Sequence, residues 1–139
     1  MEDRAFDHQG LEVLTTDECW ELLRQAPVGR IGFMESGHPT IFPVNHALLG
    51  HRVVIRTAGG ALLHQALMDQ SIAFEVDGFD AEHRTGWSVL VQGMVGLLPA
   101  DIDVDELHLD AWADSIARDR AVMLMPEEIN GRRIILREP

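Results

Sequence analysis

The stretch Val-Gly-Arg-Ile-Gly-Phe-Met-Glu-Ser-Gly-His-Pro-Thr-Ile-Phe-Pro-Val-Asn-His-Ala-Leu, residues 28–48, decides the fold. Its two ends, 28–34 and 40–48, are rich in β-branched and aromatic residues, and the middle, Glu-Ser-Gly-His-Pro at 35–39, is made of turn formers. Two such runs separated by a few turn residues predict antiparallel strands joined in a hairpin. We therefore expect a β-hairpin at the centre of the fold.

An amphipathic helix is predicted before this hairpin. Thr15 is followed three residues later by Glu18, the capping box that commonly begins a helix. Pro27 marks the end of the helix, because the residue before a proline avoids helical geometry. The apolar positions have helical spacing and lie on one face: Cys19, Leu22, Leu23 and Ala26.

The chain after the hairpin alternates between short strands and turns. In the strand over 52–57, Val53 and Ile55 are expected to face one way, and Val54 and Arg56 the other. Further strands are predicted over 71–77, 87–98, 121–125 and 132–136, short helices around 62–67 and 104–112, and polar loops over 78–86 and 126–131. Six or seven strands with few helices predict a mostly β protein, an antiparallel sheet closed into a small barrel with short helices.

Composition narrows the class of protein. A chain of 139 residues fits one domain, which we expect over 14–139 after a flexible N-terminus at 1–13. The apolar runs are too short to span a bilayer. The net charge of -12 disfavours binding to nucleic acid or to an anionic membrane surface. The single cysteine and the absence of a signal peptide pattern favour a cytoplasmic protein.

Few residues suggest side-chain chemistry. The seven histidines show no spacing typical of a metal site, so none is expected, although His46 and His51 flank a turn. Cys19 falls on the apolar stripe of the first helix, where a buried thiol is more common than a nucleophile. All 11 basic residues are arginine, which excludes a Schiff base on lysine. We assign no catalytic residue.

Two segments have the features of a ligand site. Arg56-Thr57-Ala58-Gly59-Gly60 places a cation and a hydroxyl at a strand end before a helix, an arrangement that can hold an anion. A surface turn is an equally good interpretation of the same residues. Trp87 and Ser88 open the longest strand, where an aromatic ring beside a hydroxyl can line a planar ligand, although a tryptophan there more often packs.

In their order and spacing these segments resemble the pyridoxamine 5'-phosphate oxidase-like family of FMN-binding split barrels, within the flavin and deazaflavin oxidoreductase superfamily. The resemblance covers about 14–134. It is carried by Leu-Thr-Thr-Asp-Glu-Cys (14–19), Pro-Val-Gly-Arg-Ile-Gly-Phe (27–33), Pro-Val-Asn (43–45), Arg-Thr-Ala (56–58), Ala-Phe-Glu-Val-Asp (73–77), Thr-Gly-Trp-Ser-Val-Leu-Val-Gln-Gly (85–93) and Asn-Gly-Arg-Arg-Ile (130–134).

The resemblance implies a six-stranded antiparallel Greek-key split barrel and a homodimer with flavin sites at the subunit interface. It implies an FMN-dependent oxidoreductase acting on a small molecule, with the redox chemistry supplied by the cofactor. Arg56, Thr57 and Ala58 would approach the phosphate, together with Leu62. Pro43, Val44 and Asn45 would lie along the isoalloxazine ring, and Trp87 and Ser88 would line the pocket.

Departures from the family pattern leave alternatives open. Ala61 and Leu62 stand where relatives often carry the threonine and lysine that grip phosphate. The Trp-Arg-Leu ending of true pyridoxamine phosphate oxidases is missing, so that activity is not expected. A deazaflavin-dependent reductase is one alternative. A non-catalytic split barrel that carries flavin, haem or no cofactor is the other.

Overall fold

The computed structural model describes residues 5–6, 10–26, 28–56, 61–107 and 121–135. Two helices and seven strands make up most of the fold, and a short 3-10 helix precedes the last strand. In chain order they are β1 (Glu12–Val13), α1 (Thr16–Gln25), β2 (Val28–Glu35), β3 (His38–Leu48), β4 (Val53–Arg56), α2 (Ala61–Met68), β5 (Ser71–Asp80), β6 (Thr85–Gly96), η1 (Val104–Leu107) and β7 (Ala121–Ile135).

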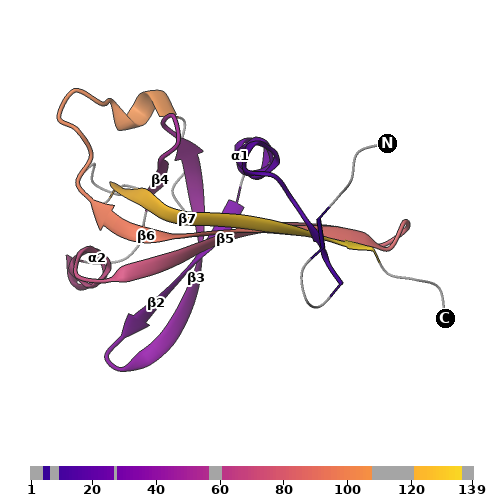
Figure 1. Ribbon diagram of the computed structural model, residues 1–139. Coiled ribbons are helices and arrows are strands. Elements are labelled where there is room, and N and C mark those ends of the chain that lie inside the picture. The colour runs from indigo at the N-terminus through magenta and orange to yellow at the C-terminus, as the bar shows by residue number, and fades with distance from the viewer. Residues whose placement is uncertain (1–4, 7–9, 27, 57–60, 108–120, 136–139) are drawn as a thin grey trace.

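Six of the strands close into an antiparallel ring in the order β2-β3-β4-β7-β6-β5, with β5 paired back to β2. The seventh, β1, adds to the outer side of β7. The ring is split, because β5 pairs with β2 over only three residues, and β7 pairs with β4 over only its first four. The far ends of β5, β6 and β7 run on together beyond the ring (Figure 1). The expected antiparallel split barrel with short helices is confirmed.

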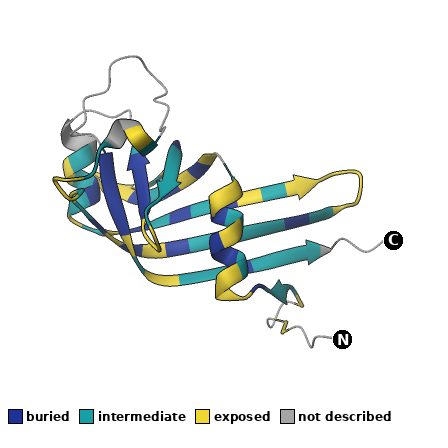
Figure 2. Cartoon of the chain, turned by 90° about the horizontal axis from the view of Figure 1, so that it is seen from above, coloured by how far each residue is buried: buried dark blue, intermediate teal, exposed yellow. Residues whose placement is uncertain are grey.

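The core lies inside the ring and under α1. Alternate residues of each strand point inward, so that Phe74 and Val76 of β5 are buried while Glu75 between them is not. Helix α1 lies across the inward side of the sheet, as Figure 2 shows, and presents Cys19, Trp20 and Leu23 to the core. The expected alternation in β4 is confirmed too: its inward residues join this core, and Val54 joins a second small cluster outside it.

Helix α1 begins as the capping box predicts. The Glu18 N–H donates to Thr15 Oγ1 at 3.2 Å, and the Thr15 N–H donates to Glu18 Oε1 at 2.9 Å. These bonds satisfy two of the donors that a helix start leaves without partners. The helix ends at Gln25, and Pro27 lies outside the described residues. The cap thus fixes where α1 enters the fold.

The polar segment 78–86 is not the loop that its composition predicted. β5 continues to Asp80 and β6 begins at Thr85, so the hairpin keeps its register almost to the tip. Gly78 makes this possible, because a Cβ there would lie 2.7 Å from the Trp87 indole nitrogen. At the tip the Asp80 carboxylate accepts hydrogen bonds from two backbone N–H groups, a pattern typical of turns. The loop prediction was wrong because polar residues on an exposed hairpin end still pair.

The predicted loop at 126–131 was also wrong. Residues 121–135 form one strand, β7, which pairs with β6 from Met123 to Ile135. The sequence suggested a break because proline cannot donate to a strand ladder. The structure absorbs Pro126 in a β-bulge, where Gly93 pairs with Pro126 and Gln92 with Glu128, leaving Glu127 as the extra residue. A Cβ at Gly93 would overlap the Met125 carbonyl oxygen, so the bulge also needs a glycine opposite it.

The two remaining helix predictions fare differently. The short helix around 62–67 is confirmed as α2. Of the helix around 104–112, η1 covers 104–107, and 108–112 lie outside the described residues. In the part of the chain that the structure describes, no helix has the length and apolar character needed to cross a membrane.

Candidate functional site

The residues predicted to lie along a flavin ring occupy the middle of β3. Their side chains alternate, so Val44 is buried in the core at 3% exposure while Pro43 and Asn45 are on the outward face. β4 ends opposite Asn45, because Asn45 and Arg56 are the last pair of the β3–β4 ladder. On its β4 side, β3 therefore has no ladder partner at Pro43 and Val44 among the described strands.

Arg56 is the last residue of β4 and shares the outward face with Asn45, since directly paired residues point the same way. Thr57 and Ala58, predicted to approach a phosphate with it, lie outside the described residues. Helix α2 begins at Ala61, with no acidic residue in its first turn. The backbone of Leu62 is in that turn, and its side chain is outside the description. A cation and a helix start with no acidic residue in its first turn together favour an anion here.

Trp87 and Ser88 point to opposite faces of β6. The Trp87 ring packs against the core beside Gly78, whereas Ser88 is on the outward face, paired with Asp77 of β5 and Arg132 of β7. Ser88 therefore shares a face with Pro43 and Asn45, and Trp87 does not. The predicted contacts of both residues with a cofactor stay predictions.

The outward candidates fall into two groups within one chain. One group is Asn45 with Arg56, and the other is Ser88 with its neighbours on β5 and β7. By way of β7, Arg56 and Ser88 are two strand spacings apart but eleven residues offset along the strand, because Arg56 pairs with Ala121 and Ser88 with Arg132. By way of β3, β2 and β5, with no such offset, the two residues are four strand spacings apart. At about 4.8 Å per spacing, this is about 19 Å along the curved sheet.

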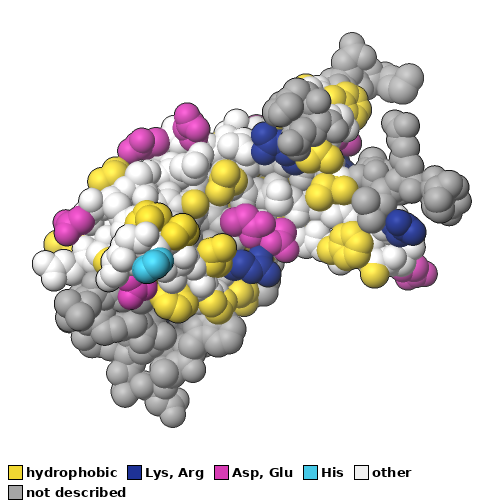
Figure 3. Space-filling view, turned by 90° about the horizontal axis from the view of Figure 1, so that it is seen from below, with side chains coloured by type: hydrophobic (Ala, Val, Ile, Leu, Met, Phe, Trp, Pro, Cys, Tyr) yellow, Lys and Arg dark blue, Asp and Glu magenta, His cyan; other side chains and the backbone are white. Residues whose placement is uncertain are grey.

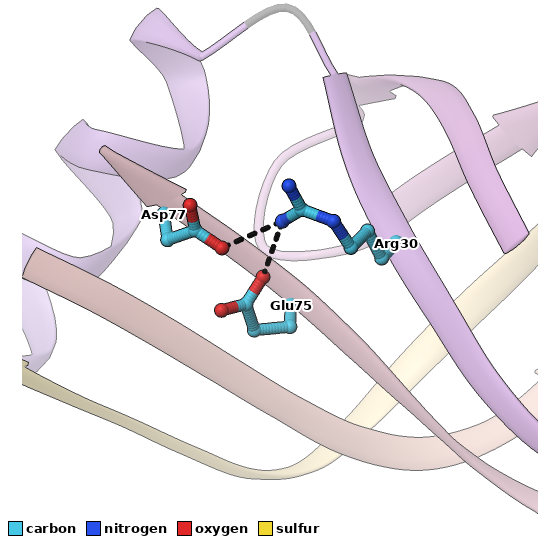
Figure 4. A network of polar contacts seen from close by, with 3 residues as sticks. All are labelled: Arg30, Glu75 and Asp77. Atoms are coloured by element: carbon cyan, nitrogen blue, oxygen red, sulfur yellow. Dashed lines mark hydrogen bonds and ion pairs between the residues drawn. The ribbon is translucent and has the colours of Figure 1, made fainter. Parts of the chain in front are cut away.

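A cluster of three charged side chains adjoins the Ser88 group on β5 and extends to β2, and it was not singled out by the sequence. Arg30 of β2 donates from Nη1 to Glu75 Oε1 at 3.1 Å and to Asp77 Oδ2 at 2.6 Å (Figure 4). Arg30 is paired with Pro43 on one side and with Glu75 on the other, and Asp77 is paired with Ser88. We call Arg30, Glu75 and Asp77 the charge cluster.

The carboxyl group of Glu75 holds its proton more tightly than an ordinary glutamate. Partial burial, together with the hydrogen bond and negative charge of Asp77, raises the pKa of Glu75 to about 7 against the opposing effect of Arg30. The two carboxylates in turn raise the pKa of Arg30. Near neutral pH the charge cluster therefore gains or loses one proton readily. The alternation of Phe-Glu-Val-Asp at 74–77 puts both acids on one face, but their arginine lies more than 40 residues away in sequence.

The histidines and the cysteine that the sequence raised have structural surroundings. His46 Nε2 donates to the Leu23 carbonyl oxygen at 2.9 Å, and burial lowers the pKa of this histidine. His51 stacks on Trp20 with ring centroids 4.6 Å apart. Burial raises the pKa of the Cys19 thiol, which opposes the thiolate form. Among the described residues, no three His, Cys, Asp or Glu side chains gather as a metal ion would require.

Comparison with known proteins identifies the family of this chain. Residues 15–133 match the family model for pyridoxamine 5'-phosphate oxidase. The chain belongs to the pyridoxamine 5'-phosphate oxidase family. The resemblance drawn from the sequence motifs is thereby confirmed, and the matched segment contains every candidate residue of the site.

Several known proteins are similar to this chain over most of their length. The uncharacterized protein Rv0080 of Mycobacterium tuberculosis is 33% identical over 95% of this chain and 92% of its own. The solved FAD binding protein from Mycobacterium smegmatis is 30% identical, with a TM-score of 0.68 over 89% of this chain and 98% of that one. A FAD-binding protein from Mesorhizobium loti, with a TM-score of 0.70 over 89% and 98%, is 21% identical and shows the shared fold alone.

Proposed function

We propose that this protein binds FMN and is a flavin-dependent oxidoreductase acting on a small molecule. The observation that carries the proposal is Arg56 at the end of β4, on the same face as Asn45 and just before the start of α2. In a chain of net charge -12, such a place for an anion is a local exception. The FAD-binding relative from Mycobacterium smegmatis, which has the same fold, supports a flavin as the ligand.

The residues present fit a flavin with one phosphate. Arg56 and the backbone at the start of α2 would hold the phosphate. The stretch of β3 before Asn45, beyond the end of β4, would offer backbone groups to the polar edge of the ring. FMN carries one phosphate, matched here by one arginine, whereas FAD adds a second phosphate and an adenine. When bound, the flavin supplies the hydride or electron chemistry.

We propose in addition that the protein is a homodimer with flavin sites at the contact between chains. The support is the distance between the two groups of outward candidates, since one chain by itself leaves Ser88 about 19 Å from Arg56 along the sheet. A second copy would bring its own Ser88 group to the Arg56 group of the first. Sedimentation should then give twice the chain mass of 15.5 kDa, and a monomer at working concentrations would contradict it.

The flavin proposal is tested by titrating the purified protein with FMN and following flavin fluorescence and visible absorption. We expect saturable binding, weakened about 10- to 150-fold in Arg56→Ala, because a charged hydrogen bond to phosphate contributes about 1.5–3 kcal/mol. Arg24→Ala, an exposed arginine on α1, is the matched control and should bind FMN as the unaltered chain does.

Two results would reject parts of this proposal. A protein that binds neither FMN nor FAD would reject the flavin site. Tighter binding of FAD, or FAD in the material released from the purified protein and identified by mass, would replace FMN by FAD. Oxidation of a reductant only in the presence of flavin, lost in Arg56→Ala, is the result expected of an oxidoreductase.

A further inference from the structure

Hydrophobic side chains reach the surface of the protein in several places, as Figure 3 shows for one face. Among the described residues, the exposed methionines are Met34, Met94 and Met125, at 48%, 38% and 40% exposure. Met34 lies on β2, opposite Pro39 of β3. Met94 of β6 and Met125 of β7 are instead paired with each other, and directly paired residues point the same way. Two exposed thioethers therefore adjoin on the outward face of β6 and β7.

A third methionine lies on the same face. Met123 precedes Met125 by two residues, so both point outward from β7, while Leu124 between them is buried in the main core. Met123 is only 4% exposed and belongs to the small apolar cluster outside the ring. Its partner on β6 is Gly96. We call Met94, Met123 and Met125 the methionine cluster.

The methionine cluster occupies three corners of a four-residue patch, and the fourth corner is a glycine. Met94 faces Met125 and Gly96 faces Met123, and the Cβ atoms of directly opposed residues lie about 4.5–5.5 Å apart. The Met125 Cε methyl lies over Gly96, since a Cβ added there would be 3.0 Å from it. A side chain that runs from the Met125 corner to the Gly96 corner crosses the middle of the patch. The Met125 thioether is therefore directed between the positions of Met94 and Met123.

Three thioethers on one patch are a ligand set for a soft cation. Methionine sulfur is neutral and polarisable, and it selects Cu(I), whereas Mg²⁺, Ca²⁺ and Mn²⁺ prefer oxygen ligands. The unbranched methionine side chain has three rotatable bonds, so the sulfurs can turn toward a common ion. Because the inner end of the methionine cluster lies among apolar side chains, a monovalent ion costs less to enclose there than a divalent one. The net charge of -12 also attracts cations to the surface.

We propose that the methionine cluster is a binding site for one soft monovalent cation, Cu(I) or Ag(I), held by its three thioether sulfurs. Met123 supplies the buried ligand, and Met94 and Met125 close over the ion from the solvent side. The ion enters as Cu(I) or Ag(I), so its binding transfers no electron, and thioethers have no proton to release. The site shares no residue with the flavin site proposed above and does not depend on it.

The site is tested by titrating the full chain with Ag(I) in chloride-free buffer, and anaerobically with Cu(I) against a coloured Cu(I) chelator. Native mass spectrometry should show one ion per chain. Met94→Leu and Met125→Leu should each weaken binding at least about tenfold, because even changes beside a metal ligand cost that much. Leucine keeps the volume and apolar character of methionine, so the melting temperature without metal should stay the same. Met34→Leu is the matched control, an exposed methionine opposite a proline, and should bind as the unaltered chain does.

The pH dependence of binding identifies the ligands. Cysteine and histidine also bind these ions, but they must lose a proton to do so, and their affinity therefore falls as the pH falls. A thioether loses no proton, so the affinities at pH 5.5 and pH 7.5 should agree within about threefold. Cys19→Ala, which removes the buried thiol, should leave binding unchanged. The proposal is overturned if no ion binds, if the Met94→Leu, Met125→Leu double variant binds normally, or if Met34→Leu loses as much affinity as the cluster variants.

Discussion

The inward and outward faces of β5 are made by neighbouring residues and differ in what holds them. Ile72, Phe74 and Val76 point inward, where they are almost completely buried among other apolar side chains. Ala73, Glu75 and Asp77 point outward: Ala73 lines a surface groove, and Glu75 and Asp77 belong to the charge cluster. The inward face is held in place by the burial of apolar side chains, whereas the outward face carries charged side chains. Stability should therefore depend on the first face, and ligand and partner binding on the second.

The largest effect is expected from opening the inward face. Phe74 is fully buried, so Phe74→Ala should lower the free energy of unfolding by about 3–5 kcal/mol, through lost burial and the cavity left behind. Urea unfolding followed by tryptophan fluorescence measures it. Ala73→Ser, one residue away on the outward face, should change the free energy by less than about 0.5 kcal/mol. Equal losses in the two variants would contradict the difference between the faces.

A smaller effect is expected where β6 and β7 approach each other most closely. Gly93→Ala should destabilise the protein by about 1–3 kcal/mol, because the added methyl group would overlap the Met125 carbonyl oxygen at the bulge. Gly32→Ala is the matched control, since its new Cβ would meet the Ala73 Cβ at 3.7 Å, an ordinary van der Waals contact. Thermal unfolding of both variants gives the comparison. A Gly93→Ala protein as stable as Gly32→Ala would mean that the bulge shifts freely.

The helix that covers the inward face offers a third test. Thr15→Ala removes the side-chain oxygen that accepts the Glu18 N–H, and the loss should be about 1 kcal/mol in the free energy of unfolding. Thr16→Ala, at the first helical position, should have a smaller effect. Chemical denaturation of the pair isolates the cap. Indistinguishable midpoints would show that α1 is held in place by its core contacts alone.

The smallest effect is expected on the outward face, where the Glu75 side chain is 34% exposed and solvent screens its charge, and this effect depends on pH. The pKa of Glu75 is raised from the ordinary 4.5 to about 7 in the folded chain. At a pH between these two values, Glu75 is therefore protonated in the folded chain and loses its proton on unfolding. The stabilisation of the folded chain by this proton is complete below pH 4.5 and is lost as the pH rises through 7.

Glu75→Gln should therefore match the unaltered chain near pH 4.5 and gain relative melting temperature by pH 8. The melting temperature is best measured on dilute samples, with Glu21→Gln on the exposed side of α1 as control. A difference between the chains that is constant with pH would contradict the assignment.

Much of the inward architecture was predictable because it depends on local patterns. The capping box at Thr15 determined the start of α1, and the alternation at 71–77 determined which side of β5 is buried. Two segments misled, since polarity at 78–86 and Pro126 both suggested loops where the strands continue. Pairing partners overruled local preference there: Trp87 fills the space left by Gly78, and Gly93 admits the bulge.

The outward site was only partly predictable. The sequence suggested Arg56 as an anion contact and Pro43 to Asn45 as a ring contact, and the pairing of Asn45 with Arg56 brings these segments together. It did not suggest the charge cluster, because Arg30 meets Glu75 and Asp77 only through the β2–β5 pairing. It also grouped Trp87 with Ser88, which point to opposite faces of one strand.

The sequence by itself determined most of the elements, the alternation in β4 and β5 and the family, because capping, alternation and motif order depend on residues close together in the chain. Only the tertiary structure decided how the outward groups combine. The register between strands more than 40 residues apart joined an arginine to two carboxylates, shifted the proton affinity of one of them and placed a groove beside Ile41. Charge interactions and shape depend on distances across the sheet, and these distances exist only once the ring has closed.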